Sequence, residues 1–216
     1  MVQPFLRPVD EPHRVLLRGR FEIREAESVW EAFALDIELP RDERQGLPTV
    51  WEIGGRIPKV SDPHHVNSDT ETLCVCLPEA YWYYHPEGLS LAEFLEGPLR
   101  THLAGQALVL RGHPWPAGEW AHDTEGRLQF FQHVFGTPDR KSTLEFLRVT
   151  CHTGVKGHWP CPCGSGERLR DCHGEVVFKM NRSKAIIPWR KAFQELEREE
   201  KSGNARRKGG RRRRKR

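Results

Sequence analysis

The segment CPCGSGERLRDCH, residues 161–173, concentrates side chains that bind metal ions. Cys161 and Cys163 are followed, after a spacer of eight residues, by the adjacent Cys172 and His173. Three thiolates and one imidazole form the donor set of a closed, four-coordinate zinc site. Zinc binding would also supply the folding free energy that a segment so poor in aliphatic residues lacks. We therefore expect a structural Zn²⁺ here, because a catalytic zinc keeps one coordination position open.

This segment resembles the SEC-C motif, whose pattern is CxCxSG, a short spacer and then CC or CH. The resemblance implies that the zinc ligands are Cys161, Cys163, Cys172 and His173. It also implies a small zinc-binding module, residues 151–180, that serves as a docking surface. Further donors nearby in the chain are alternative ligands: Cys151, His152 and His158.

A loop with two cysteines is the second candidate for chemistry. The irregular stretch 57–84 contains His65, Val66 and Asn67 and then, nine residues after the histidine, Cys74. A long loop without regular structure inside a compact domain is usually functional. An exposed Cys74 thiolate could accept an acyl group as a nucleophile. The Asn67 amide would either donate to the resulting oxyanion or brace the loop.

The order of elements over about residues 15–135 resembles the ubiquitin-conjugating (UBC) fold: strands, then an HVN…LC loop, then helices. This loop and the later WPAGEWAH segment are similar to those of bacterial ubiquitin-conjugating-like proteins from antiphage islands, including CBASS systems. The resemblance implies that Cys74 is the catalytic nucleophile and that His65 orders the loop. The implied partners are an activating enzyme and either a ubiquitin-like modifier or the C-terminus of a cyclic-nucleotide synthase.

Several nearby residues keep more than one assignment. Cys76 is the nucleophile in place of Cys74, a resolving thiol or a small buried residue. Either Asp62 or Asp69 could take a proton from the acceptor amine. Glu119 and His122 either line the same site or belong to a Trp/Pro loop that packs onto the core.

The elements that must position these residues begin with a β-meander. Apolar and polar residues alternate over 15–24 and 30–39, and a third short strand is expected over 49–53. Three strands at this spacing predict antiparallel hairpins.

Helices are expected in the second half of the chain. Ser90 and Glu93 form the pattern of a capping box, and Pro98 should kink or divide the helix that follows. Further helices are expected over 128–135, 142–149 and 181–200.

Charge is distributed unevenly along the chain. The last 16 residues, 201–216, contain ten Lys or Arg and no acid, while residues 1–200 carry 24 basic and 30 acidic side chains. We expect this tail to be disordered and to make weak, salt-sensitive contacts with nucleic acid or with an acidic protein. The whole chain is then an α+β protein, with a UBC-like domain over 1–150, the zinc module over 151–180, an amphipathic helix over 181–200 and the basic tail.

Composition excludes several classes of protein. No window approaches the 18 to 20 apolar residues, roughly, that span a bilayer, and the N-terminus has no apolar signal region. Clustered cysteines in such a chain indicate metal binding or catalysis more than disulfides. We therefore expect a cytoplasmic protein that has no membrane partner.

The function predicted by these features is a thioester carrier of the ubiquitin-conjugating type. It would pass a protein C-terminal carboxyl through Cys74 to an acceptor amine, in bacterial antiphage defence. The alternative is a non-catalytic, zinc-dependent adaptor that binds a protein partner or nucleic acid. A third interpretation is a Cys/His hydrolase in which Cys74 pairs with His65 or His122.

Overall fold

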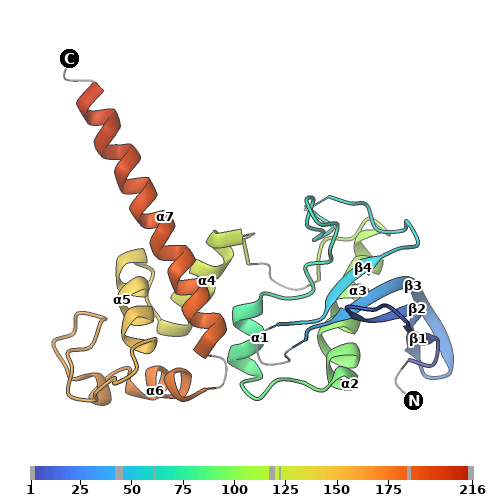
Figure 1. Ribbon diagram of the computed structural model, residues 1–216, viewed down its shortest axis with the longest axis horizontal. Helices are drawn as coiled ribbons and strands as arrows, with labels where there is room; N and C mark the ends of the chain where they lie inside the picture. The colour runs from blue at the N-terminus through green and yellow to red at the C-terminus, as the bar shows by residue number, and fades with distance from the viewer. Residues whose placement is uncertain are drawn as a thin grey trace. The chain divides into compact units, whose positions relative to one another are not determined.

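A computed structural model of the protein describes residues 3–41, 46–60, 62–116, 120–121, 123–183 and 186–213 (Figure 1). The chain divides into two compact units. The sheet unit comprises Met1–Tyr81 and Gly88–Glu119, and the helical unit comprises Trp82–Glu87 and Trp120–Arg216. The expectation of a mixed α+β protein is confirmed.

The sheet unit is built on an antiparallel sheet whose spatial order, β1-β2-β3-β4, is also the order along the chain. Its strands are β1 (Leu6–Val9), β2 (Val15–Glu25), β3 (Ser28–Leu39) and β4 (Thr49–Glu52). The three strands expected from alternation are therefore confirmed. The alternation pattern does not reveal β1, because its sequence LRPV contains a proline, which cannot donate to a β-ladder.

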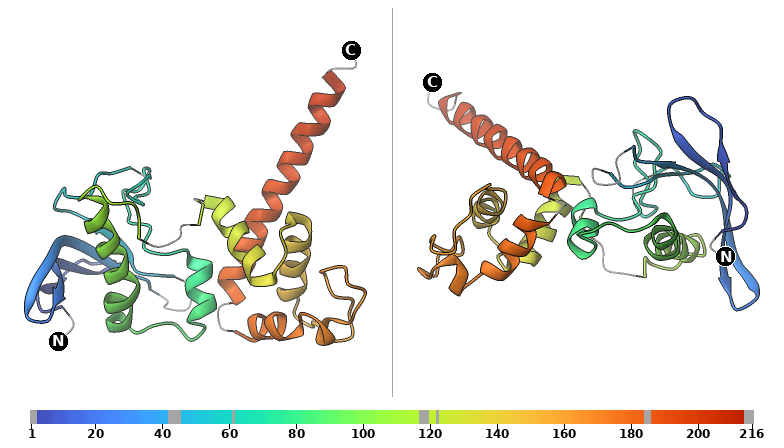
Figure 2. Two further views of the ribbon diagram at one scale, coloured as in Figure 1. Left: turned by 180° about the vertical axis from the view of Figure 1, so that it is seen from behind. Right: turned by 60° about the horizontal axis from the view of Figure 1, so that its bottom comes forward.

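One face of this sheet carries the core of the unit. Phe33, Leu35 and Ile37 alternate along β3 and are fully buried, and Ile37 lies opposite Val50 of β4. Helix α3 (Arg100–Val109) contacts β2 and β3, and it crosses one face of the sheet in Figure 2. The period-2 pattern of the sequence thus determines which face of the sheet is covered.

The helices of the sheet unit follow the expected start signal. The Ser90 N–H donates to the Glu93 carboxylate at 2.8 Å, and the Glu93 N–H donates to the Ser90 hydroxyl at 3.3 Å, which completes the capping box. Pro98 then lies in a π-helical turn, η1 (Leu95–Leu99), between α2 (Leu91–Phe94) and α3. The wide turn accommodates a residue that cannot donate a helical hydrogen bond. A short helix that was not expected, α1 (Pro78–Tyr84), precedes them.

The helical unit packs four helices around aromatic side chains. Its helices are α4 (Asp123–Phe135), α5 (Arg140–Thr150), α6 (Gly174–Arg182) and α7 (Ile186–Arg213). Phe146 of α5 stacks on Phe135 of α4 with ring centroids 4.7 Å apart, and Phe135 stacks in turn on Phe131 at 6.2 Å. Residues 120–150 thus group with the segment that follows them, whereas we expected them to belong to the first domain.

Helix α7 joins this core through its first half. Trp189, Ala192 and Leu196 are buried, and ion pairs link its glutamates to α5, including Glu197 with Arg148 at 3.2 Å and Glu200 with Arg140 at 3.0 Å. In Figure 1, α7 then extends past α4 and α5 toward the C-terminus.

The basic tail that we expected to be disordered from residue 201 is helical up to Arg213. Residues 201–213 contain no proline, so the helix that α4 and α5 anchor can continue through them. The i,i+4 pair between Glu197 and Lys201, at 2.9 Å, bridges the anchored and basic parts of the helix. Neither α7 nor another helix in the described ranges is long and apolar enough to cross a membrane.

Candidate metal centre and thiol loop

A short hairpin, residues 159–169, presents the first two metal-binding side chains. The Cys161 N–H donates to the carbonyl of Glu167 at 2.9 Å, and the Leu169 N–H donates to the carbonyl of Trp159 at 2.7 Å. Leu169 is fully buried, so the end of the hairpin is anchored in the helical unit. The backbone between these two hydrogen bonds must therefore reverse direction within a few residues.

Two glycines make this reversal possible. Gly164 and Gly166 have φ angles of 79° and 82°, in the left-handed region. A residue with a Cβ pays roughly 1–2 kcal/mol to adopt this conformation. The GSG of the motif is thus a requirement of the turn that brings Glu167 back to Cys161.

The second pair of ligands lies where a 3-10 turn, η2 (Leu169–Asp171), meets helix α6. Cys172 follows this turn, and His173 is the N-cap residue of α6. The ring of Phe146, from α5, packs against the His173 ring with centroids 5.0 Å apart. The imidazole is thereby oriented by the core of the helical unit.

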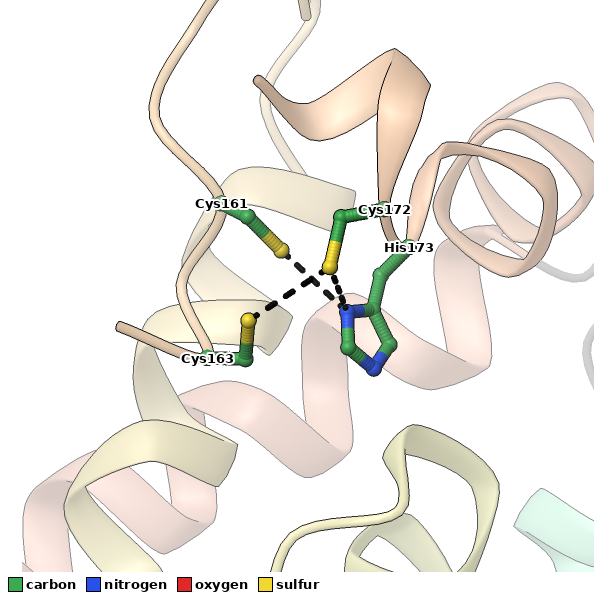
Figure 3. Close-up of side chains that lie close together, drawn as sticks. All are labelled: Cys161, Cys163, Cys172 and His173. Carbon is green, nitrogen blue, oxygen red and sulfur yellow. Dashed lines mark hydrogen bonds between the residues drawn. The ribbon is translucent and has the colours of Figure 1, made fainter. Parts of the chain in front are cut away.

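The four ligand atoms converge on one point (Figure 3). They all lie within 4.8 Å of one another. The Cys163 and Cys172 sulfurs are 3.6 Å apart, and His173 Nδ1 lies 3.2 Å from the sulfur of Cys161 and 3.0 Å from that of Cys172. A tetrahedral zinc with ordinary bond lengths would give separations of about 3.8 Å between sulfurs and about 3.5 Å between sulfur and nitrogen. These three separations would lengthen by a few tenths of an ångström around the ion, and no separation exceeds 4.8 Å.

The electrostatics of the cluster also favour a cation. The Ser165 hydroxyl, through its hydrogen bond, is the main reason why the pKa of Cys163 is lowered to about 6. Ser165 also acts to lower the pKa of Cys172, but desolvation and the sulfurs of Cys163 and Cys161 outweigh it and raise that pKa to about 12. Neighbouring thiols do not ionise together, because like charges repel. A divalent ion would remove this repulsion, and its binding would release the thiol protons.

The alternative ligands are not part of the cluster found in the described chain. The His152 ring packs against Trp159 with centroids 5.0 Å apart, and its Nδ1 accepts from the Gly154 N–H at 3.0 Å. Cys151 is half-buried, and burial raises its pKa to about 11, against the opposing effect of the Arg190 charge. The structure thus brings together the four residues predicted from the motif and leaves the neighbouring donors outside.

The thiol loop of the sheet unit is organised by a small antiparallel bridge between Val66 and Leu73. Next to this bridge, the Cys74 N–H donates to the carbonyl of His65 at 2.7 Å. The Leu73 N–H donates to the carbonyl of Val50 at 2.8 Å, which attaches the loop to β4. Cys74 is therefore carried by an ordered backbone.

The two sides of this bridge differ in burial. Val66 and Leu73 are buried, whereas Asn67 and Cys74, one residue further along each strand, are exposed. Since side chains alternate on either side of a β-bridge, Asn67 and Cys74 both face outward, at opposite ends of the antiparallel bridge, where Asn67 is bonded to Thr72 and Cys74 to His65. The Asn67 side-chain oxygen accepts from the Asp69 N–H at 3.1 Å, so it also braces the loop. Asp62, the other candidate acid, is exposed as well.

Cys76 differs from Cys74 in its surroundings. It is only partly accessible, and its pKa is raised to about 12, first by burial and then by the charge of Glu79. A thiol with a raised pKa supplies little thiolate at neutral pH. Of the two cysteines, Cys74 has the exposure that a nucleophile needs.

His65 is packed against other rings. Its centroid lies 4.5 Å from that of Trp115 and 6.4 Å from that of His102. This packing agrees with an ordering role for His65, and it places Trp115 against His102 of α3 as well. Glu119 and His122 lie outside the described residues.

The sequence pattern did not lead us to His102 and Gln106, which are both buried on α3 next to this loop. Gln106 Nε2 lies 3.2 Å from His102 Nε2, one helical turn away. The available signal was a pair of polar residues at i,i+4 within the apolar run LRTHLAGQALVL. On a helix that covers a sheet, such a pair indicates a buried polar contact.

Comparison with protein families identifies the SEC-C motif at residues 160–175. No curated protein and no solved structure matches the chain. The prediction of a SEC-C motif is thus confirmed, and the Cys/His cluster within it is compatible with a bound metal ion. Zinc is the ion that three thiolates and an imidazole in a tetrahedral arrangement favour.

Proposed function

We propose that the sheet unit is a thioester carrier of the ubiquitin-conjugating type, with Cys74 as its nucleophile. The observation that supports this proposal is an exposed thiol on a hydrogen-bonded loop, with Asn67 also facing outward. An antiparallel meander precedes the loop and a helix that packs on the sheet follows it. The resemblance to the UBC fold rests on this order of meander, loop and helix.

The reaction has two steps. In the first, the Cys74 thiolate attacks the carbonyl carbon of an incoming thioester, the bond from that carbon to the donor sulfur breaks, and the donor leaves as a thiolate. In the second, an acceptor amine attacks the same carbon and the bond to Cys74 Sγ breaks. The amine loses a proton to water or to an exposed carboxylate such as Asp69. The Asn67 amide donates to the oxyanion in both steps.

The zinc-binding motif has a structural role in this proposal. It holds part of the helical unit together and offers a surface for a protein partner. The partners are an activating enzyme and either a ubiquitin-like modifier or the C-terminus of a cyclic-nucleotide synthase. The cellular process is bacterial antiphage defence of the CBASS type, a proposal that rests on the resemblance of the HVN…LC loop.

Acyl loading and discharge of the full chain test this proposal. The probe is a synthetic peptide α-thioester that ends in glycine, and the readout is intact mass. We expect a mass gain that thiol reductant removes, that persists in Cys76→Ala and that is absent in Cys74→Ala. Asn67→Ala should both load and discharge onto free lysine about 100-fold more slowly, because it lacks the oxyanion donor of the two steps. Loading of Cys74→Ala would show that Cys74 is not the carrier. Discharge of Asn67→Ala at the rate of the unaltered chain would show that Asn67 is not the oxyanion donor.

A second candidate function, a nucleic-acid-binding adaptor, is favoured by the basic end of α7. The anchored half of the helix pairs its glutamates with α4 and α5, whereas residues 201–213 contain seven Lys or Arg and no acid. A helix with this charge suits the phosphate backbone of nucleic acid, which it would bind without sequence preference.

Deleting residues 203–216 removes nine basic side chains and should weaken binding to a 20-base-pair DNA duplex at low salt. The slope of log affinity against log salt should become shallower, by about 0.9 for each phosphate that the basic end neutralises in the full chain. Lys59→Ala, which removes an exposed cation of the sheet unit, is the control and should change the slope little. Equal slopes for the full chain and the deletion would show that the basic end of α7 does not contribute to nucleic-acid binding.

A further inference from the structure

The side-chain amide of Gln106 connects helix α3 to the thiol loop. Gln106 is fully buried. Its Nε2 donates to the backbone carbonyl of His64 and lies 3.2 Å from His102 Nε2, and its Oε1 lies 3.3 Å from His64 Nδ1. The amide thus uses both of its N–H groups and its oxygen within the protein. A buried polar group satisfied in this way fixes the geometry of its partners.

The chemistry of an amide assigns the proton positions in this network. An amide nitrogen only donates, so His102 Nε2 must be an unprotonated acceptor, and an amide oxygen only accepts, so His64 Nδ1 must carry hydrogen. Burial, followed by the neighbouring His65, lowers the pKa of His102 to about 3, which agrees with a neutral ring. The network is therefore stable in one arrangement at neutral pH.

This network is connected to Cys74 through the backbone of His64 and His65. His64 precedes His65, whose carbonyl accepts from the Cys74 N–H at 2.7 Å. The other face of the network is closed by Trp115, whose ring centroid lies 5.4 Å from that of His102. A Cβ at position 105 would lie 2.8 Å from the Trp115 ring, so Gly105, beside Gln106, provides the space that this packing needs.

We infer that Gln106 is a positioning residue for Cys74, an inference that rests on the function proposed for this thiol. The glutamine holds the backbone at His64, and the His65 carbonyl in turn holds the Cys74 amide. Its contribution comes from hydrogen bonds rather than from volume, because the amide faces two acceptors and one donor. Without these bonds the His64–Cys74 segment loses its hydrogen bonds to Gln106 of α3, and a displacement of the thiol by about 1 Å can slow a reaction 100-fold.

The substitution Gln106→Met tests this role, since methionine has similar length but makes no comparable hydrogen bonds. The measurement is hydrogen exchange of the Cys74 amide relative to that of the Ile37 amide in β3, in the full chain. We expect this ratio to rise at least about tenfold in Gln106→Met, in line with the loss of a buried hydrogen bond. In the control Leu103→Ala, which alters a fully buried apolar residue on the same helix, the ratio should stay unchanged even if the unit is destabilised.

Two results would overturn the inference: an unchanged ratio in Gln106→Met, or an equal rise in Leu103→Ala. Neither outcome depends on acyl transfer, so this test can succeed when Cys74 forms no thioester.

The functional arm uses the glycine thioester and free lysine. Gln106→Met should lower the maximal rate of discharge at least about tenfold and leave the lysine concentration for half-maximal rate unchanged, because the substituted group does not touch the acceptor.

Discussion

Replacing Cys172 with alanine is expected to abolish zinc binding and to lower the melting temperature of the helical unit by more than about 10 °C. Structural zinc contributes about 10–16 kcal/mol in zinc-finger peptides at neutral pH. For a domain of about 100 residues each kcal/mol shifts the midpoint by about 4–8 °C, so a loss of about 3 kcal/mol suffices. The loss should reach α5 and α6, because His173 begins α6 and packs against Phe146 of α5.

Thermal melts followed by circular dichroism, with and without a strong chelator, measure this effect. The control is Cys151→Ala, which alters a nearby cysteine outside the cluster and should melt within a few degrees of the natural chain. Chelator should lower the midpoint of the natural chain and leave that of Cys172→Ala unchanged. If Cys172→Ala melted with the natural chain and responded to chelator in the same way, Cys172 would not be a ligand.

The second large effect is expected at Trp189. This side chain of α7 is 1% exposed, and truncating a buried tryptophan to alanine costs about 3–5 kcal/mol of unfolding free energy. Ile187, on the same helix, is 50% exposed and provides the control, because Ile187→Ala should change stability by about 0.5 kcal/mol or less.

Urea unfolding followed by circular dichroism at 222 nm compares these two variants. Trp189→Ala should lower the midpoint clearly with little change in slope, since the folded core loses packing while the surface exposed on unfolding stays similar. Equal midpoints for Trp189→Ala and Ile187→Ala would mean that α7 is not part of the core of the helical unit.

The Cys/His cluster could be predicted from the sequence because its determinants are local. All four ligands lie within residues 161–173, and the glycines that turn the backbone lie between them. The sheet was predictable for a similar reason, since alternation along β3 marks the buried face strand by strand. The motif and the meander are thus properties of short segments.

The organisation of the helical unit depends on contacts that no local pattern contains. Phe146 meets His173 from a distant part of the chain, which is why residues 120–150 group with the zinc motif. The tail was expected to be disordered because its charges repel. That argument treats it as an isolated segment, whereas the helix is already started by the buried residues Trp189 and Leu196.

In the thiol loop, too, the sequence indicated some features and only the fold shows the others. The sequence indicated a loop with Cys74, Asn67 and His65, but exposure separates Cys74 from Cys76, and exposure depends on packing. Gln106 was missed because it is 42 residues away from His64 in the sequence. Only the fold shows that the Gln106 amide lies against His64.

The most direct test of the metal centre is native mass spectrometry of the full chain. We predict one Zn²⁺ per chain under native conditions, its loss under denaturing conditions, and its absence from Cys172→Ala under both. A natural chain without zinc, or a Cys172→Ala variant that retains it, would contradict the assignment of Cys161, Cys163, Cys172 and His173 as a structural zinc site.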